Sequence, residues 1–556
     1  MKRQMNRVGL GVAVVLSLAT VVGAADSADK SAAPDPQKVY SEAEAVQIGW
    51  PQLAGPLSNF SPVKTDIPLV DDLSKVTVAW TTENLGLGIG KQSTDFGKAM
   101  VTSRIESYLG PDSKSHPGSW AGVIVGEGKV FASSMRPTGP FVEVEYPDKK
   151  AKVRVDAEDL VVAVDFLTGK KLWEAAEPGS VLWGGGKRVG FQVAPVYSNG
   201  KVFTMGATGR VFAYDAANGK KLWQSDIGEL HKKAEAERTK VLESLAKGKF
   251  DFPKIDSWSS ALVLADGVLV VPTFSGNSIR GLNLADGSKL WEAAGVISPR
   301  NAPSVFTSGG REYLLIANER GEMRLLNPKD GKELWKVSDL GPNFFTLAPS
   351  QTHVLVNVSK GKASGDRDTR EPGSWGGYRI SPEKAELAWK KDWKTDACGL
   401  PIWADTYANL QQTIRDGIGY FTTIDGTEFG GSNKKGSRFV LVRMDTGEIV
   451  REHQNPDGNV PKAELSLLGG QLWYLIGDKV ICRPNSTHGP RHGGRHPWSL
   501  WQVTDKEIKQ LPGQLDKNEF ITGYEVLAQV PIVAGRMIER TETGGILCYD
   551  LRASAK

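Results

Sequence analysis

Short runs of alternating hydrophobic and polar residues occupy most of this chain, and turn residues separate them. Within residues 194–224 four such runs follow one another, at 194–197, 201–206, 210–215 and 220–224. The runs are rich in β-branched and aromatic residues, and the connections contain Gly next to Asn or Thr. This pattern predicts consecutive β-hairpins. Four antiparallel strands per unit are typical of one blade of a β-propeller.

An eleven-residue phrase recurs at the third turn of this unit. It occupies residues 163–173, 213–223, 281–291 and 325–335, with Asp or Asn third, Gly seventh and Trp last. Repetition of this kind indicates a repeat architecture. The Asp or Asn is expected to accept backbone N–H bonds in the turn, and the Gly to take a left-handed conformation. We expect the Trp on the outermost strand to pack against the neighbouring blade, as a structural docking residue. The docking positions are Trp80, Trp173, Trp223, Trp291, Trp335 and Trp389.

The later units are less regular, but they complete a count of eight. A sixth unit keeps the turn at 443–450 without the Trp, and a seventh is weaker still at 466–503. The last, at 529–550, has only three runs, and its missing fourth strand is predicted at 75–80. Pairing of the two ends would close the ring and remove open sheet edges. The pattern predicts an all-β, eight-bladed propeller over residues 49–556. Seven blades is the alternative, if 456–520 forms none.

The two segments before the propeller predict export. Residues 1–24 have a basic start, an apolar stretch at 8–22 and small residues at the end, as in a signal peptide. Residues 25–48 are small and polar and predict a flexible leader. The mature chain is expected to be periplasmic or extracellular, soluble, and without stable membrane insertion. One insertion, at 228–248, has an apolar face at helical spacing and predicts a helix.

Charge and cysteine content narrow the classes of partner. Removal of the three basic residues of 1–24 lowers the formal net charge from +4 to +1, which argues against a nucleic-acid partner. Hydrophobic residues make up 40% of the 556 residues, enough for a large core. Of the three cysteines, Cys398, Cys482 and Cys548, at most two can form a disulfide. Cys482 and Cys548 lie in apolar runs, so we expect them to be buried.

The phrase with its terminal Trp resembles the tryptophan-docking repeat of the pyrroloquinoline-quinone-like propellers, in the quinoprotein alcohol dehydrogenase-like superfamily. Trp50-Pro51-Gln52, followed by Gly55-Pro56, resembles the opening of exported bacterial members. Leu53 and Ala54 stand where an aromatic residue and an Arg are frequent. The resemblance covers about residues 50–553 and implies an eight-bladed ring and export. It does not imply one activity, because the superfamily holds both quinone-dependent dehydrogenases and the scaffold lipoprotein of the barrel-assembly machinery.

The dehydrogenases of this superfamily bind pyrroloquinoline quinone (PQQ) and Ca²⁺, and commonly have a disulfide between adjacent cysteines. This chain has no adjacent cysteines and no Cys-x-x-Cys-His phrase. No catalytic residue, metal ligand or cofactor is therefore assigned. We expect a non-enzymatic binding or assembly scaffold whose partner is another protein or a cell-envelope component. The alternatives are a PQQ- and Ca²⁺-dependent alcohol or sugar dehydrogenase, and a glycan-binding propeller.

Loops that lead into the innermost strands surround the mouth of a propeller, so they are the predicted partner- or ligand-facing surface. The candidates there are Trp120, Trp258, Arg300, Asn301, Phe344, Asn409 and Gln412. Trp120 and Trp258 could instead pack beneath their loops. A separate loop carries His488, His492 and His496. It is either a Zn²⁺ or Cu²⁺ ligand set or a solvated basic loop, since Arg491 and Arg495 would repel a cation.

Overall fold

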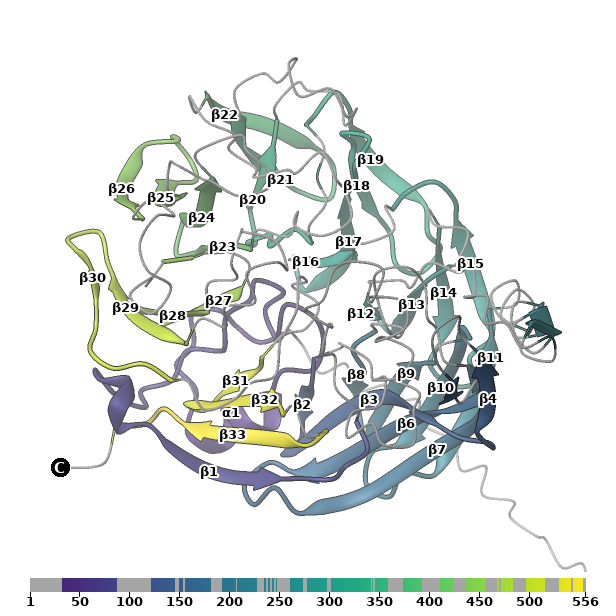
Figure 1. Cartoon of the computed structure of the whole chain (residues 1–556). Helices are drawn as coiled ribbons and strands as arrows, with labels where there is room; N and C mark the ends of the chain where they lie inside the picture. Colours follow the sequence, from purple (N-terminus) through teal and green to yellow (C-terminus); the bar gives the residue numbers. More distant parts are fainter. Residues whose placement is uncertain are drawn as a thin grey trace, which may run out of the picture. The chain divides into compact units, whose positions relative to one another are not determined.

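Eight β-sheets follow one another around a ring, each forming one blade of a propeller (Figure 1). The computed structural model describes residues 33–87, 122–145, 150–153, 156–181, 193–206, 208–227, 261–273, 278–297, 302–341, 343, 346–358, 374–392, 411–424, 437–455, 468–469, 472–483, 497–515, 530–541 and 544–553, with seven further residues between 235 and 247. Residues 33–556 form one unit, to which all that follows refers.

Blades 1 to 4 each contain four antiparallel strands in chain order, the first of them innermost. Their strands are β2 (Ile124–Gly126), β3 (Lys129–Pro137), β6 (Asp156–Asp165) and β7 (Lys171–Val181) in blade 1; β8 (Val196–Ser198), β9 (Lys201–Met205), β10 (Arg210–Asp215) and β11 (Lys221–Asp226) in blade 2; β12 (Val263–Ala265), β13 (Val268–Pro272), β14 (Ile279–Asn283) and β15 (Lys289–Ala293) in blade 3; β16 (Ser304–Ser308), β17 (Arg311–Ala317), β18 (Met323–Leu326) and β19 (Glu333–Val337) in blade 4. A short hairpin, β4 (Val142–Glu145) with β5 (Lys150–Val153), extends from blade 1.

Blades 5 to 8 complete the ring, and blade 8 takes its outermost strand from the beginning of the chain. Their strands are β20 (His353–Asn357), β21 (Ser374–Ile380) and β22 (Ala385–Asp392) in blade 5; β23 (Gln412–Arg415), β24 (Ile418–Ile424), β25 (Ser437–Arg443) and β26 (Ile449–Gln454) in blade 6; β27 (Leu472–Ile476), β28 (Lys479–Arg483), β29 (Ser499–Val503) and β30 (Ile508–Gln510) in blade 7; β31 (Ile532–Val533), β32 (Arg536–Arg540), β33 (Ile546–Asp550) and β1 (Thr77–Thr82) in blade 8.

Both predictions about the size and closure of the ring are confirmed. β27 to β30 form a complete sheet, so the alternative of seven blades is wrong. β1 pairs antiparallel with β33, with Thr77 opposite Asp550 and Thr82 opposite Ile546. The end of the chain is thereby joined to its beginning, and neither strand is left with an open edge at the closure.

The connections distinguish the two ends of every blade. In all blades but blade 5, a turn of two residues joins the first and second strands. Both turn residues have positive φ in blades 1, 2, 3, 4, 6 and 8, as in Asn199-Gly200 and Asp266-Gly267. Such turns match the twist of a hairpin, and Asn-Gly and Asp-Gly suit them best. The third turn lies at this same end, called the turn end below. The longer connections, from second to third strand and from blade to blade, lie at the opposite, loop end.

A β-bulge precedes the docking position of seven blades. In blade 2, Lys221 lies opposite Tyr214 and Trp223 opposite Ala213, so Leu222 is an extra residue on β11. The same register shift occurs in blades 1, 3, 4, 5, 6 and 8. A bulge re-aims the side chains that flank it. Leu222 is 43% exposed as a result, while Trp223 is buried.

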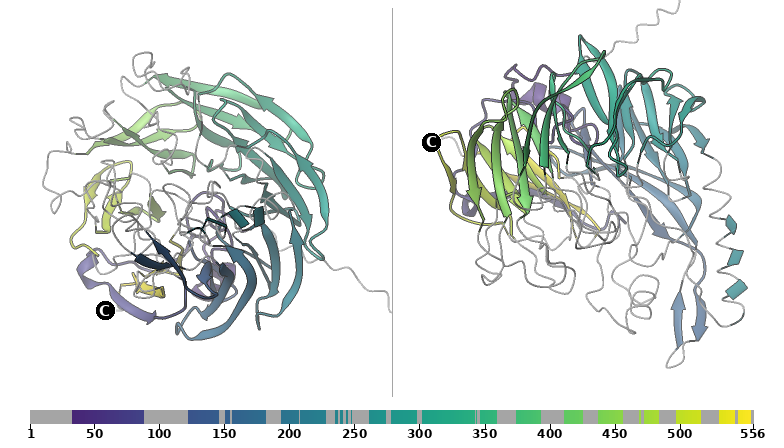
Figure 2. Two further views of the ribbon diagram at one scale, coloured as in Figure 1. Left: turned by 45° about the vertical axis from the view of Figure 1, so that its right-hand side comes forward. Right: turned by 90° about the horizontal axis from the view of Figure 1, so that it is seen from above.

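The first described segment, residues 33–76, packs against the blades before it enters β1. Within the stretch expected to be a leader, α1 (Glu42–Ile48) is a helix that begins with a capping box. Glu44 N–H donates to Ser41 Oγ, and Ser41 N–H donates to Glu44 Oε2 at 2.9 Å. Ala45 and Tyr40 are buried, so this part of the chain is anchored. In the right-hand view of Figure 2, α1 is drawn in purple along the upper edge of the sheets.

Other parts of the chain add little regular structure. Six of the described residues between 235 and 244, within the predicted helical insertion, are helical. Among the helices that the structure describes, none has the length and apolar content needed to cross a membrane. The proposed signal peptide, residues 1–24, lies outside the described residues.

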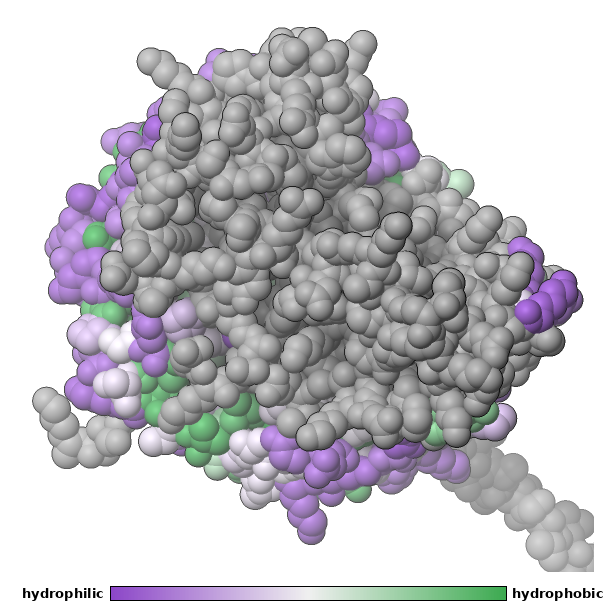
Figure 3. Space-filling view, in the orientation of Figure 1, coloured by the Kyte–Doolittle hydropathy of each residue, from purple (hydrophilic) through white to green (hydrophobic). Residues whose placement is uncertain are grey.

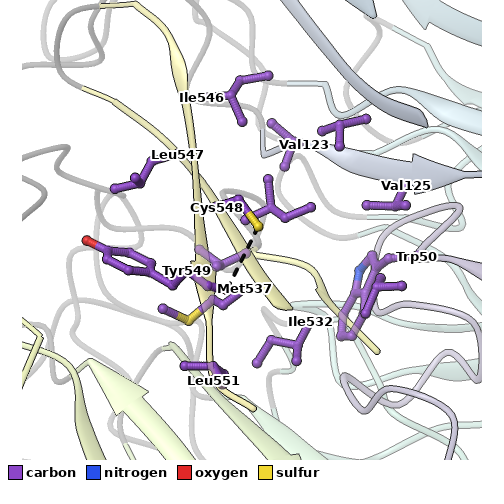
Figure 4. Packing of buried hydrophobic residues seen from close by; sticks show 14 of the residues in the cluster. Trp50, Val123, Val125, Ile532, Met537, Ile546, Leu547, Cys548, Tyr549 and Leu551 are labelled. Atoms are coloured by element: carbon purple, nitrogen blue, oxygen red, sulfur yellow. Dashed lines mark hydrogen bonds between the residues drawn. The ribbon is translucent and has the colours of Figure 1, made fainter. Parts of the chain in front are cut away.

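The core lies between the blades. Its largest cluster joins blades 8, 1 and 7 and includes Trp50, Met537 and Tyr549 (Figure 4). Cys482 and Cys548 are both buried, as expected from their apolar runs, and neither forms a disulfide with another described residue. Burial raises the pKa of the Cys482 thiol to about 11. On the face shown in Figure 3, the described surface is largely hydrophilic, with one hydrophobic area.

Candidate functional site

The docking Trp residues connect consecutive blades through one repeated contact. Each of the six indole N–H groups donates to a backbone carbonyl of the following blade, at 2.7 to 3.0 Å. In four pairs the acceptor directly follows the Asp or Asn of the recurring phrase: Trp80 to Phe166, Trp173 to Ala216, Trp223 to Leu284 and Trp291 to Pro328. The phrase of one blade therefore forms the docking surface for the Trp of the preceding one.

The Gly of the phrase leaves room for the indole ring of the preceding blade. A Cβ on Gly219, Gly287 or Gly331 would lie 2.6 Å from the ring of Trp173, Trp223 or Trp291. All three glycines also have φ between +69° and +74°. Gly is required here twice, once for the left-handed backbone and once for the close approach of the ring. Trp335 meets Ser381 in place of such a turn and is only partly buried.

At the loop end, a buried ion pair crosses from blade 1 to blade 2. Arg210 on β10 donates to Asp159 Oδ2 on β6 at 2.9 Å, and the two side chains are only 11% and 7% exposed. Ser180 Oγ donates to the other carboxylate oxygen at 2.7 Å. Arg210 also donates to the Pro178 carbonyl at 2.7 Å. Both charges are therefore neutralised and hydrogen-bonded, which is the condition for burying them.

A second buried carboxylate lies between blades 7 and 8, also at the loop end. Glu539 on β32 accepts hydrogen bonds from the indole N–H of Trp498 at 2.8 Å and from Arg483 Nη1 at 3.3 Å. The adjacent Arg540 donates to the Leu87 carbonyl. Burial lowers the pKa of Arg540 to about 9, because desolvation disfavours its charged form.

Asparagine side chains fix the connections from blade to blade. Asn455 after β26 donates to the Leu468 carbonyl at 2.9 Å and accepts from the Leu468 N–H at 2.8 Å. Asn343 does the same with both backbone groups of Asn357, at 3.3 and 3.1 Å. A side-chain amide that bonds to both the N–H and the C=O of one residue makes the same two hydrogen bonds that a neighbouring β-strand would make. These asparagines therefore hold the loop ends in place.

Most of the mouth candidates from the sequence lie outside the described residues. This applies to Trp120, Trp258, Arg300, Asn301, Phe344 and Asn409, and equally to Cys398 and the loop of His488, His492 and His496. Gln412 is described, as the first residue of β23, and it is only 1% exposed. Neither atom of its amide has a hydrogen-bond partner among the described residues.

The buried charges were not anticipated from the sequence. Asp159, Arg210, Arg483 and Glu539 lie at the ends of ordinary strand runs, and their partners are 51 and 56 residues away. Only the juxtaposition of two blades brings them together. Charged residues that interrupt the apolar end of a strand run are the one signal that could have pointed to them.

The described residues do not fit a site for Ca²⁺ and PQQ. Such a site needs carboxylate oxygens that are free to bind a cation. Asp159 and Glu539 each face an arginine instead, which would repel the metal. In the part of the chain that the structure describes, no group of three or more His, Cys, Asp or Glu side chains is placed to hold an ion.

Comparison with known proteins shows similarity to two kinds of protein, an assembly factor and an alcohol dehydrogenase. A family model described as the outer membrane protein assembly factor BamB matches residues 157–343. The quinohemoprotein alcohol dehydrogenase ADH IIB of Pseudomonas putida is 23% identical over an alignment of 237 residues, with a coverage of 36% of this chain. The match spans 33% of that relative's own length.

The comparison with solved structures also finds a BamB and quinohemoprotein alcohol dehydrogenases. BamB from Moraxella catarrhalis has a TM-score of 0.41 at 11% identity, over 76% of this chain and 99% of that one. A quinohemoprotein alcohol dehydrogenase from Comamonas testosteroni has a TM-score of 0.40 at 12% identity, over 93% and 84%. The resemblance seen in the sequence is confirmed: this chain is an eight-bladed β-propeller with PQQ-like repeats, similar both to the BamB family model and to a quinohemoprotein alcohol dehydrogenase.

Proposed function

We propose that this protein is a non-enzymatic binding or assembly scaffold that acts outside the cytoplasm, with another protein or a cell-envelope component as its partner. The observation that carries the proposal is the pairing of the buried carboxylates at the loop end. Asp159 and Glu539 are each held by an arginine of the neighbouring blade. These charges connect blades and are not free for a metal, so the described site supports a rigid ring better than a reaction centre.

The family comparison supports the same proposal. The matching model, residues 157–343, is that of an assembly factor, and it covers the two outer strands of blade 1 and all of blades 2 to 4, where the docking phrase is most regular. A ring whose blades are joined by docking Trp residues and buried ion pairs holds the ends of its described strands in fixed positions. A rigid frame lowers the entropy lost when a partner binds. The expected partner surface is the loop end.

The second candidate is a dehydrogenase that uses PQQ and Ca²⁺. One observation favours it, the sequence similarity to a quinohemoprotein alcohol dehydrogenase over 237 residues. That relative is matched over only a third of its length, so its activity is not carried over to this chain. The expected absence of a cofactor is a prediction that an experiment must decide.

A titration with PQQ in the presence of Ca²⁺, followed by calorimetry and Trp fluorescence, distinguishes the two candidates. The scaffold proposal expects no saturable binding at high micromolar quinone. Saturable binding at one site per chain, lost when Ca²⁺ is removed, would instead favour the dehydrogenase. In that case the variant Glu539→Gln, compared with Glu383→Gln at an exposed position, would show whether the buried carboxylate takes part.

A further inference from the structure

Residues 49–65 lie inside the ring, against the inner edges of the innermost strands (Figure 1). Trp50 pairs antiparallel with Val125 of β2, through two hydrogen bonds of 2.8 and 3.0 Å. The next two residues continue around the ring. The Pro51 carbonyl accepts from Tyr197 N–H of β8 at 2.8 Å, and Gln52 Oε1 accepts from Leu264 N–H of β12 at 2.9 Å.

The segment then reaches the opposite side of the ring. Thr413 Oγ1 of β23 donates to the Asn59 carbonyl, and Asn59 Nδ2 donates to the Ile414 carbonyl at 3.4 Å. Lys64 continues to the turn end of blade 6, where it pairs with Asp416 at 3.0 Å. Four blades, 1, 2, 3 and 6, thus receive a hydrogen bond from one short stretch of chain.

Apolar contacts add three more blades, 4, 7 and 8. The Trp50 ring meets the ring of Tyr474 on β27 edge to face, with centroids 5.7 Å apart. Figure 4 shows Trp50 beside Val125 and Ile532. Leu53, Ala54 and Phe60 are buried in the same cluster as Val263 of blade 3 and Val305 of blade 4. Trp50 itself is fully buried.

These contacts give the innermost strands hydrogen-bond partners that a propeller sheet alone does not provide. The innermost strand of each blade has no partner strand on its axial side, so its N–H and C=O groups require other partners. The segment follows the curve of the ring by left-handed backbone at Gly49, Ala54, Gly55, Ser58 and Phe60, with φ between +52° and +77°. Such a conformation is unfavourable for Ala, Ser and Phe and persists where the surroundings hold it.

We propose that residues 49–65 are an internal brace, which ties the innermost strands together and closes the turn end of the ring's axis. Among the described residues, the brace then covers the turn-end side of the centre of the ring. The brace explains why this opening phrase, Trp50-Pro51-Gln52, carries a large aromatic residue and an amide at fixed spacing. It is independent of the proposed scaffold role, because a dehydrogenase with this ring would be braced in the same way.

Thiol labelling of the full chain tests the closure. Ser61, within the brace, is 1% exposed, whereas Ser74, further along the same N-terminal segment, is exposed. The variants Ser61→Cys and Ser74→Cys are treated with a charged maleimide, and labelled peptides are identified by mass spectrometry. Labelling at position 61 should be slower by on the order of 100-fold, because it requires local opening. Equal rates at the two positions would overturn the proposal.

Amide hydrogen exchange tests the individual contact without disturbing the core. The variant Gln52→Ala removes the acceptor of Leu264 N–H and leaves the backbone of the brace in place. Exchange at residue 264 should become faster by on the order of 10-fold, while the control Gln510→Ala, at an exposed position of β30, leaves it unchanged. No acceleration at residue 264 in Gln52→Ala would contradict the contact on which the brace depends.

Discussion

At the scale of single residues, the docking contact between two blades has two complementary parts. The Trp of one blade presents an indole N–H and a ring face, and the turn of the next blade presents a carbonyl and a bare Gly. Neither half stabilises anything alone. The phrase is therefore found repeated, because each copy serves one interface as the donor of the ring and the next as its acceptor.

Two glycines of blade 4 allow the two requirements on the docking Gly, the left-handed backbone and the close approach of the Trp ring, to be measured separately. Gly331 and Gly310 have φ of +69° and +72°, but a Cβ on Gly331 would lie 2.6 Å from Trp291, while one on Gly310 would meet nothing within 4 Å. Gly310→Ala should cost only the left-handed backbone, about 1 kcal/mol. Gly331→Ala should lower the free energy of unfolding further, by roughly 1–3 kcal/mol more, because the ring must move. Equal losses in denaturant unfolding would show that the close approach does not matter.

Glu322, in the loop-end turn of blade 4, should make stability depend on pH. Burial raises its pKa, but hydrogen bonds from Asn318 and Arg324 lower it more, to about 2 from the ordinary 4.5. The ionised form is thus favoured by folding. Its contribution should be complete above pH 4.5 and lost as the pH falls toward 2.

The variant Glu322→Gln measures this contribution. At pH 7 its free energy of unfolding should be lower than that of the natural chain by roughly 1–2 kcal/mol, and the difference should shrink steadily below pH 4.5. A difference that stays constant between pH 7 and pH 2.5 would mean that ionisation of Glu322 is not linked to folding.

At the scale of elements, the blades are joined differently at their two ends. Near the turn end, the docking contacts are apolar rings against a turn. At the loop end, buried ion pairs and asparagine amides connect strands of neighbouring blades. The loop end consequently contains the buried charged groups, and the loss of a partner there should lower the free energy of unfolding most.

The Asp159–Arg210 pair permits a quantitative test of this difference. Asp159→Asn or Arg210→Met leaves one buried charge without its counterpart and should lower the free energy of unfolding by about 3–5 kcal/mol. The double variant should lose less than the sum of the two, which a double-mutant cycle in denaturant would show. The exposed pair Lys384–Glu386, at 2.6 Å, is the control and should contribute less than about 1 kcal/mol. Additive losses at 159 and 210 would contradict a direct coupling.

At the scale of the whole molecule, the ring is one cooperative object closed by β1 and β33. A chain that ends at Gly545 lacks β33, so β1 and β32 would each lose their partner strand. Its unfolding midpoint should fall by on the order of 10 °C or more, and open edges should produce aggregates in size-exclusion chromatography. A chain that ends at Ala553 is the matched control. A monomer of normal stability from the shorter chain would show that closure is dispensable.

Local signals made most of the ring predictable. Turn glycines, alternation and the docking Trp lie within a few residues of one another, so blades and closure followed from the sequence. α1 was missed although Ser41 and Glu44 have the spacing of a capping box. The ion pairs and the course of residues 49–65 depend on distant partners, such as Ile414 for Asn59 and Tyr474 for Trp50, which no local pattern contains. The mouth candidates stay predictions.

The brace has a consequence for the order of folding. Trp50 to Gln52 contact blades 1 to 3, but Asn59 needs blade 6, Trp50 also needs Tyr474 of blade 7, and Glu42 pairs with Arg552 near the far end of the chain. The first residues of the unit thus cannot reach their final positions until the last have been made. Contacts between distant parts of a chain form slowly. We expect the early blades to stay partly formed until the last blades have been made, and the ring then to close in one late, concerted step.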